Sequence, residues 1–428
     1  MNIAFYTLGC KVNQYETEAM REAFAAAGHT VVPDSAPFDA IVINSCTVTA
    51  ESDRKTRQTV RRFRKERPDA AIVLTGCMVQ AFSSEAQALS DADVIAGNTD
   101  VKKIMEYTER FLSDGERIFE VSKHTKTERF NTPLLSDFAE RTRAYMKIED
   151  GCERFCTYCI IPTARGFVRS KPLGEIKAEA EALSKAGFSE IVLVGINLTS
   201  YGTGESFDLA DAVDAVCDVD GIKRVRLGSL EPDHMSDEML LRFKKQEKFC
   251  PQFHLSLQSG CDETLKRMNR HYDTAFYRDL VTRIRKSFID AAITTDIMVG
   301  FAGETEEEFT QSLNFAKEIG FAKTHIFAYS RRAGTAAYGL PNQVSKAEKA
   351  RRSRLMSEAT IKTEGKFLNS LVGRVFPVLF ETAQDGFAEG YTANYSRVRV
   401  KSDNPHTGEI LNVKIVSAEN EYCVGELI

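Results

Sequence analysis

Three cysteines, Cys152, Cys156 and Cys159, stand within the nine-residue segment GCERFCTYC. A structural zinc site closes with four ligands and a catalytic one holds three plus water, so these CxxxCxxC thiols could form part of either. A cubane 4Fe-4S cluster bound by three cysteines instead keeps one iron open to a small molecule. Buried packing is the third interpretation. The spacing, the flanking Gly151 and Tyr158, and the position directly after a predicted strand favour the cluster.

The open iron of such a cluster can chelate the amino and carboxylate groups of S-adenosylmethionine (SAM). Electron transfer into the sulfonium then cleaves SAM to methionine and a 5′-deoxyadenosyl radical, which is the radical SAM use of this spacing. An aromatic residue between the last two cysteines suits a side chain that lies beside the adenine, so we expect Tyr158 to take that place.

A second set of cysteines, the strand-end thiols, consists of Cys10, Cys46 and Cys77. Each stands at or just past the carboxyl end of a predicted strand, and in doubly wound folds the functional crevice lies off those ends. We therefore predict that they converge at one edge of a sheet, although buried structural cysteine is the more common outcome for such wide spacing. The other cysteines share no pattern and are assigned to packing: Cys217, Cys250, Cys261 and Cys423.

The elements that carry the strand-end thiols belong to a first region, residues 1–112. NIAFYTL, DAIVINSC, AAIVLTGC and DADVIAG are apolar strands, and helices are expected over 15–28 and 50–66. Continuous apolar strands between helices predict a parallel sheet covered on both faces, so we expect a flavodoxin-like doubly wound α/β domain. Residues 113–142 are polar and weakly periodic, which indicates a linker with room for one strand.

Strand and helix alternate again over residues 143–362. Six candidate strands predict an incomplete (β/α)6 barrel of TIM type, whose active site lies at the carboxyl ends of the strands. These strands are AYMKIED, EIVLVGIN, KRVRLGS, QFHLSLQ, ITTDIMVG and KTHIFAYS. A basic helix is expected over 345–366. Residues 363–428 change to short alternating strands separated by Gly, Asn, Asp and Pro, a pattern typical of a small OB-like β-barrel.

The overall composition agrees with several domains and indicates a compartment. A chain of 428 residues exceeds one ordinary domain, and 43% apolar residues suffice for several cores. The N-terminus MNIAFYTLGC lacks the basic and apolar regions of a secretory signal, and no apolar run is long enough to span a bilayer. We expect a cytoplasmic protein without membrane contact, in which the ten cysteines are ligands, catalysts or packing residues rather than disulfides.

Taken together, the motifs resemble the radical SAM methylthiotransferase family over essentially the whole chain. The segments that carry the resemblance are GCERFCTYCIIPTARG, TLGCKVNQYETE, INSCTVT, VLTGC, VGINLTSYG, SLEP, HLSLQSGCDETLKRMNR, TDIMVGFAGETEEEF and HIFAYSRRAGTAA. The resemblance implies a methylthiotransferase N-terminal domain, a radical SAM core and a C-terminal TRAM domain. TLGCKVNQYETE, HLSLQSG and YSRRAGT look most like the branch that acts on threonylcarbamoyladenosine beside the tRNA anticodon. Other branches act on isopentenyladenosine in tRNA or on an aspartate of a ribosomal protein.

The resemblance also implies a reaction and its cofactors. The strand-end thiols would hold an auxiliary 4Fe-4S cluster that carries or donates sulfur, and one SAM would methylate that sulfur. A second SAM, at a 4Fe-4S cluster on the CxxxCxxC thiols, would yield the radical. A methylthio group would then replace the hydrogen on the adenine carbon between the two pyrimidine nitrogens. An aromatic C–H is a poor target for acid–base chemistry, so the sulfur must wait within bonding reach of the radical.

Candidate SAM contacts stand at the ends of the barrel strands. Backbone at Gly195 and Asn197 could bind the SAM amino group, or these residues form only a tight turn. We expect Gln258 and Ser259, which end the fourth strand, to hydrogen-bond the ribose. Glu231 in SLEP lies near the site by its position in the sequence.

Charged and glycine residues further along the barrel are weaker candidates. Arg285, or Arg283, could pair with the SAM carboxylate, but a solvated helix face explains either arginine at least as well. Gly300 and Gly303 suit a close backbone approach to the adenine, and a plain turn explains them nearly as well.

Two basic runs point to RNA. Residues 54–67 carry eight basic residues and one acid, and residues 346–374 carry eight against three, in a chain of net charge −5. Such runs are commonly solvated faces, but here they lie beside the predicted sulfur-bearing edge and the small β-barrel, so we expect phosphate contacts. Tyr391, Tyr395 and Phe387 could stack on unpaired bases, or pack the core of that β-barrel.

Four positions depart from the family pattern. Glu149 stands where we expect Gln, Glu153 where Asn is common, Met78 where an aromatic is common, and Ala302 where Pro is usual. None of them is a predicted cluster ligand, so the departures concern local contacts rather than the reaction.

We expect the partners to be a tRNA anticodon stem-loop, a reducing electron donor such as flavodoxin or ferredoxin, and a sulfur donor of unknown identity, with the chain itself a monomer. Three alternatives stay open. The same chemistry could act on a protein. The chain could be an electron-transfer or redox-sensing iron–sulfur protein without a substrate, or a zinc-dependent RNA-binding module.

Overall fold

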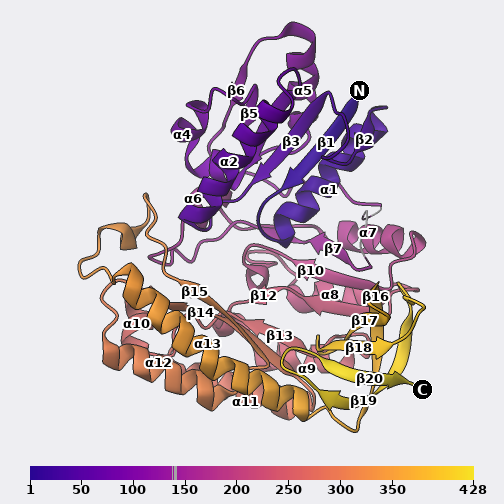
Figure 1. Ribbon diagram of the computed structural model, residues 1–428, viewed down its shortest axis with the longest axis vertical. Helices are drawn as coiled ribbons and strands as arrows, with labels where there is room; N and C mark the ends of the chain where they lie inside the picture. The colour runs from indigo at the N-terminus through magenta and orange to yellow at the C-terminus, as the bar shows by residue number, and fades with distance from the viewer. Residues whose placement is uncertain (137, 139–141) are drawn as a thin grey trace.

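The computed structural model describes residues 1–136, 138 and 142–428. It is built from an α/β sheet layer at the N-terminus, a barrel of parallel strands beneath it, and a small β-barrel at the C-terminus (Figure 1). The three-part fold class predicted from the sequence is confirmed. Residues 137 and 139–141 of the predicted linker lie outside the described residues.

The N-terminal sheet is parallel, with strand order β2-β1-β3-β4-β5-β6. Its strands are β1 (Asn2–Thr7), β2 (Thr30–Val32), β3 (Ala40–Ser45), β4 (Ala71–Gly76), β5 (Val94–Ala96) and β6 (Ile118–Glu120). Its helices are α1 (Lys11–Ala26), α2 (Ala50–Glu66), α3 (Cys77–Ala81), α4 (Ser83–Gln87) and α5 (Lys103–Asp114). Alternate residues of the strands enter two separate apolar clusters, so β3 and β4 are buried at every position.

The sheet differs from the expectation at two places. The four predicted strands are present, but β2 was not predicted, whereas β6 is the one strand for which the linker segment left room. Both have only three residues, too few to show a strand pattern. The first helix begins at Lys11 rather than at residue 15, because Cys10 has an extended backbone and occupies the N-cap position.

The central barrel contains all six predicted strands, and they run parallel. They are β7 (Ala144–Lys147), β10 (Glu190–Val194), β11 (Arg224–Leu227) continued by β12 (Ser229–Leu230), β13 (Gln252–Leu255), β14 (Ala292–Val299) and β15 (Lys323–Ala328). The sheet order β11-β10-β7 and β12-β13-β14-β15 leaves β7 and β15 as the two edges, so the barrel is incomplete. A short antiparallel pair, β8 (Glu149–Asp150) and β9 (Arg169–Ser170), follows the first strand.

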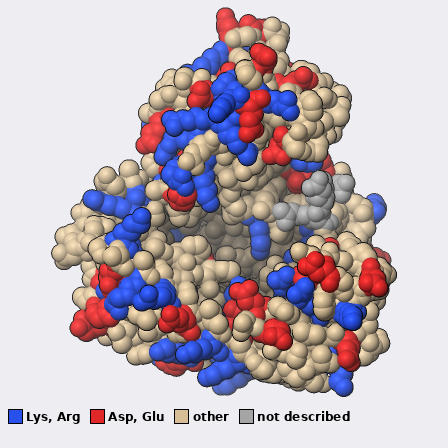
Figure 2. All heavy atoms as spheres, in the orientation of Figure 1, with Lys and Arg blue, Asp and Glu red and all other residues tan. Residues whose placement is uncertain are grey.

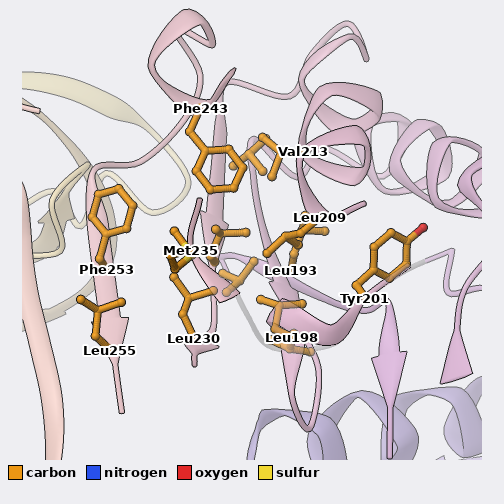
Figure 3. Close-up of a cluster of buried hydrophobic side chains, with 14 of the residues drawn as sticks. Leu193, Leu198, Tyr201, Leu209, Val213, Leu230, Met235, Phe243, Phe253 and Leu255 are labelled. Carbon is orange, nitrogen blue, oxygen red and sulfur yellow. The ribbon is translucent and has the colours of Figure 1, made fainter. Parts of the chain in front are cut away.

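Helices cover the outside of this barrel (Figure 1). They are α7 (Leu173–Lys185), α8 (Leu209–Cys217), α9 (Asp237–Lys245), α10 (Asp262–Arg267), α11 (Thr274–Ser287), α12 (Glu306–Ile319) and α13 (Lys346–Asn369), and α6 (Ile161–Arg165) lies in the loop after β8. Short 3-10 turns span Leu198–Ser200, Pro232–His234 and Ala336–Gly339. Between strands and helices, Leu193, Phe253 and Leu255 pack with Val213 and Phe243 (Figure 3).

The C-terminal part is a closed barrel with strand order β16-β17-β18-β20-β19. Its strands are β16 (Val375–Gln384), β17 (Phe387–Thr392), β18 (Arg397–Lys401), β19 (Ile410–Ala418) and β20 (Cys423–Leu427). Its strand pairs are antiparallel except for β18 with β20, and closure pairs every strand edge, so none is left exposed. None of the described helices combines the length and the apolar character that a membrane span requires.

Candidate active site with two sets of three thiols

The strand-end thiols lie at the carboxyl ends of three adjacent strands of the N-terminal sheet. Cys10 follows β1, Cys46 follows β3, and Cys77 begins the helix after β4. A Cβ atom on Gly9 would lie only 3.2 Å from the Cys46 Sγ, so the turn after β1 runs directly against Cys46. Burial raises the pKa of the Cys77 thiol to about 12, Arg165 opposes this, and Cys46 and Cys10 add to it through their charges. The three thiols therefore converge, as their places in the sequence predicted.

The CxxxCxxC thiols lie at the carboxyl end of the first barrel strand, in the loop between β8 and α6. A backbone hydrogen bond from Cys159 N to Cys156 O, 2.9 Å long, folds this loop into a turn. The pKa of both Cys152 and Cys159 is raised to about 12, chiefly by burial, and the charge of the neighbouring Cys156 thiol contributes in the same direction. All three line a pocket of about 620 Å³, which Gln80 of the N-terminal part also lines.

A buried arginine reaches one sulfur in each set. Arg165 Nε lies 3.1 Å from the Cys77 Sγ, and Arg270 Nη1 lies 3.2 Å from the Cys156 Sγ. Both side chains are almost completely buried. Among the described residues, no group of three or more Cys, His, Asp and Glu side chains is arranged to hold a metal ion by itself. Two sets of soft thiol donors, each beside a buried cation, fit thiolate-bound iron–sulfur groups, which carry negative charge.

Arg165 belongs to a buried charge network between the N-terminal part and the barrel. It donates to both carboxylate oxygens of Glu16 on α1, with Nη2 3.0 Å from Oε2. Lys147 of β7 donates to the same carboxylate over 2.7 Å and to Asp150 over 2.6 Å. Burial opposes the charge on these carboxyls, but the cations prevail and lower the pKa of Glu16 and Asp150. The network fixes the loop of the CxxxCxxC thiols against the strand-end thiols.

Arg270 organises the other side of the barrel opening. It donates to Glu231, to the Ser256 carbonyl over 3.2 Å and to the Tyr272 hydroxyl over 3.1 Å. Its Nη1 also lies 3.5 Å from the Tyr158 hydroxyl. Glu231, predicted near the site by position alone, thus acts through Arg270 on the Cys156 sulfur.

Gly195 and Asn197 lie against the buried carboxyl group of Glu149. The Asn197 backbone N–H donates to Glu149 Oε2 over 2.7 Å, and a Cβ on Gly195 would lie 2.5 Å from the same oxygen. Glu149 Oε1 is buried and has no hydrogen-bond partner within the described residues. Burial raises the pKa of Glu149 well above its ordinary value, which favours the neutral acid over the carboxylate. A Gln, expected from the family pattern, is uncharged as well.

The remaining ribose and adenine candidates follow the fourth and fifth strands of the barrel, β13 and β14. Gln258 has a left-handed backbone with φ of 67° at the end of the fourth strand. Ser259 is completely buried, and its hydroxyl accepts from Cys261 N over 3.3 Å. Gly300 has a positive φ and leaves room for the Lys349 side chain, whose Cγ would lie 2.4 Å from an added Cβ.

Arg285 and Arg283 are located away from the thiols. Arg285 Nη2 donates to the carbonyls of Ile319 and Gly320 at the end of α12, over 2.8 and 3.0 Å. Arg283 pairs with Asp237 and Asp279 on the outer helices. Arg285 stands in the last turn of α11 and Arg283 just before it. The next strand begins beyond this helix end, so both lie where barrel strands start rather than where they end. The SAM-carboxylate expectation for Arg285 is corrected accordingly.

A second cavity, of about 490 Å³, lies between the open barrel and the C-terminal β-barrel. Its lining includes Lys11 beside Cys10, His254 and His325 from the barrel strands, and Tyr391 and Tyr395. The two tyrosine rings stack with centroids 4.7 Å apart. The molecule is visibly hollowed at the centre of one face, where its three parts meet (Figure 2).

The two basic runs differ in how their arginines are paired with acidic residues. Lys and Arg side chains gather over α2, on the same face as the hollow (Figure 2), and Arg61, Arg62 and Lys65 there are exposed. On α13, Arg351 and Arg352 instead pair with glutamates of α12 and of its preceding loop. The α2 run therefore presents three exposed cations as a free basic face on the side of the hollow. The α13 run loses two arginines to ion pairs but keeps Lys346, Lys362 and Lys366 exposed.

Arg165, Arg270 and Lys11 are the site residues that sequence reasoning missed. Each lies inside a motif quoted above, within CIIPTARG, LKRMNR or TLGCKVNQ, so the signal was available. It was not used because a single arginine or lysine in a motif does not indicate its partner.

The four cysteines assigned to packing are all buried.

The comparisons with known proteins agree with this geometry. The radical SAM superfamily pattern matches residues 146–316, and the uncharacterized protein family UPF0004 matches residues 2–97. Among solved structures, the radical SAM methyltransferase TsrM from Kitasatospora setae has a TM-score of 0.58 at 13% identity, covering 78% of this chain and 73% of that chain. The cobalamin-dependent SAM radical enzyme OxsB has a TM-score of 0.52 at 10% identity, covering 83% and 56%. The fold and the thiols thus define a radical SAM protein.

Curated relatives match over nearly the full length. Threonylcarbamoyladenosine tRNA methylthiotransferase MtaB from Bacillus subtilis is 37% identical, covering 100% of this chain and 96% of the relative. Its counterpart from Thermotoga maritima is 35% identical, covering 98% and 95%. A tRNA-2-methylthio-N(6)-dimethylallyladenosine synthase from Clostridium perfringens is 34% identical, covering 99% and 96%. This chain belongs to the radical SAM methylthiotransferases, a family of enzymes that use SAM and 4Fe-4S clusters.

Proposed function

We propose that this protein is a tRNA methylthiotransferase that converts threonylcarbamoyladenosine next to the anticodon to its 2-methylthio derivative. The observation that carries the proposal is the contact of Arg165, from the loop after the CxxxCxxC thiols, with the strand-end thiol Cys77. The chain is also 37% identical to the threonylcarbamoyladenosine tRNA methylthiotransferase of Bacillus subtilis. Isopentenyladenosine in tRNA is the second candidate, favoured by the Clostridium perfringens relative at 34% identity. A ribosomal protein substrate has no such support among these relatives.

The proposed assignment gives each thiol set one cluster. The CxxxCxxC thiols would hold the cluster that binds SAM, and the strand-end thiols would hold the auxiliary cluster. The chemistry that these groups supply when bound is one-electron cleavage of a sulfonium and delivery of sulfur. We assign residues 1–112 to the sulfur-delivering domain, 143–362 to the radical SAM core and 363–428 to the terminal β-barrel.

The protein's own residues then have electrostatic and positioning roles. Arg165 and Arg270 offset the negative charge that thiolates bring into a buried site, since a neighbouring guanidinium favours the thiolate form. Glu231 and Tyr272 orient Arg270. Glu149 accepts from the Asn197 backbone N–H and so holds it beside the loop of the CxxxCxxC thiols, and its raised pKa disfavours a charge there.

The substrate-facing surfaces follow from the same proposal. The free basic face of α2 would contact phosphates of an anticodon stem-loop, and Tyr391 and Tyr395 would meet its unpaired bases. A reducing donor such as flavodoxin or ferredoxin would supply electrons to a monomeric, cytoplasmic enzyme.

The deciding experiment is mass spectrometry of tRNA nucleosides from cells that lack this protein. Loss of 2-methylthio-threonylcarbamoyladenosine, restored by the wild-type chain but not by Cys156→Ala, is expected. Loss of the 2-methylthio-isopentenyladenosine signal instead would move the enzyme to the other branch. An unchanged nucleoside profile would overturn the proposal.

A further inference from the structure

Lys11 lies beside the strand-end thiols but has no role in the reaction described above. It follows Cys10 directly, begins α1, and lines the cavity of about 490 Å³ between the barrel and the C-terminal β-barrel. The side chain thus stands where the strand-end thiols meet the space that a base could enter.

The cations of this cavity differ in whether they have an anionic partner. Arg226, Lys323 and Arg397 are each paired with a glutamate. Within the described residues, the Lys11 ammonium makes no hydrogen bond or ion pair, and it lies 5.8 Å from the centre of the Tyr145 ring. A partly buried ammonium without a carboxylate partner is costly, and a bound anion would restore the lost interactions.

The proposed substrate carries an anion at the matching edge of its base. In adenine, C2 and the amino nitrogen N6 flank N1 on one edge. A threonylcarbamoyl group on N6 therefore extends along the edge whose C2 receives the sulfur, and its threonine part ends in a carboxylate. A base whose C2 faces the strand-end thiols directs that carboxylate to the neighbourhood of Cys10, where Lys11 stands. An isopentenyl group on N6 is apolar and offers nothing to an ammonium.

We propose that the Lys11 ammonium binds the carboxylate of the threonylcarbamoyl group and so selects this nucleoside over adenosines whose N6 substituent is uncharged. The inference rests on the proposed function and assigns its substrate specificity to one residue. A charge-assisted interaction of this kind is directional and disappears when either partner becomes neutral.

The test measures binding of the protein, with both clusters reconstituted, to anticodon stem-loops. Three stem-loops differ only at the target position, which carries threonylcarbamoyladenosine, its carboxyl methyl ester, or adenosine. We expect the wild type to bind the carboxylate form about tenfold or more tightly than the ester. Lys11→Gln should bring that ratio close to one, and Lys11→Arg should keep most of it. Lys323→Gln, in the same cavity but paired with Glu364, should leave the ratio unchanged.

Two results would overturn the inference. One is a carboxylate-to-ester ratio that stays at the wild-type value in Lys11→Gln. The other is equal weakening toward all three stem-loops together with loss of iron, which would assign Lys11 to support of the thiol site. Methylthiolation of an isopentenyladenosine stem-loop and not of the threonylcarbamoyl form by the wild type is a different result, because it overturns the proposed function itself.

Discussion

The Nε of Arg165 lies 3.1 Å from the Sγ of Cys77, so a guanidinium from the loop after one set of thiols touches a sulfur of the other. The same guanidinium holds Glu16 on α1. The relative position of the two sets is therefore determined by buried charge as well as by the chain that connects them.

Replacing Arg165 by Met should lower the free energy of unfolding by about 3–5 kcal/mol, because it removes a partner of the buried Glu16 carboxylate. Denaturant unfolding measures the decrease, and iron content per chain should fall with it. Adding Glu16→Leu should recover part of the stability. Arg61→Met, on the exposed face of α2, is the control and should change stability by no more than about 0.5 kcal/mol. Equal behaviour of Arg165→Met and this control would contradict the interpretation.

Cys156→Ala and Cys46→Ala should separate the two thiol sets. The first should abolish formation of 5′-deoxyadenosine from SAM under reducing conditions. The second should retain some cleavage but yield no methylthiolated tRNA, since it removes a ligand from the other set. Anaerobic assays of both products, with iron analysis, check this. Reductive SAM cleavage by Cys156→Ala at the wild-type rate would refute the assignment of the CxxxCxxC thiols.

Gly195→Ala should destabilise the protein by about 1–3 kcal/mol. The added methyl would lie 2.5 Å from Glu149 Oε2 and 2.9 Å from Glu149 Cβ, so rotation of the carboxyl end alone cannot relieve the clash. Gly174→Ala in α7 is the matched control, because nothing lies within 4 Å of an added Cβ there. Because Gly174 stands in the first turn of α7, the control should leave the stability unchanged or raise it slightly. Similar melting temperatures for the two variants would count against the close approach.

Glu149 should make the stability fall as pH rises. Its pKa is raised in the folded state by burial, so the folded chain keeps a proton that the unfolded chain releases above the ordinary carboxyl pKa. Between that pKa and the raised one, the contribution declines by up to about 1.4 kcal/mol per pH unit. Glu149→Gln, compared with the wild type by denaturant unfolding from pH 5 to pH 8, should gain in relative stability toward pH 8. A difference independent of pH would show that Glu149 is ionised.

The basic face of α2 should make tRNA binding depend on salt. Neutralising Arg61 and Lys65 together should weaken binding and flatten the plot of log affinity against log salt by roughly 0.9 for each phosphate that the variant no longer neutralises. Arg278→Ala, which removes an exposed arginine paired with Glu318 on the outer helices, should leave the slope unchanged. An unaltered slope in the α2 variant would contradict phosphate contact by this face and assign that contact to other residues.

The sequence predicted what depends on strand pattern and missed what depends on side-chain pairing. The thiols were predicted because each follows an apolar strand, and parallel strands bring their carboxyl ends to one edge. Arg165 was missed because its partners, Glu16 and Cys77, come from other elements. Arg285 was misplaced because a basic residue on a helix does not reveal which end of the barrel it faces.

The ion pair between Glu16 and Arg165 can form only late in the synthesis of the chain. These residues are 149 positions apart, so Glu16 leaves the ribosome long before its partner. At roughly 5–20 residues per second, synthesis of the intervening segment takes about 7–30 s. During that interval the N-terminal sheet can fold, but the Glu16 carboxylate on α1 lacks the guanidinium that will pair with it. The nascent chain thus holds the three strand-end thiols before the Arg165 guanidinium that contacts Cys77 has been made.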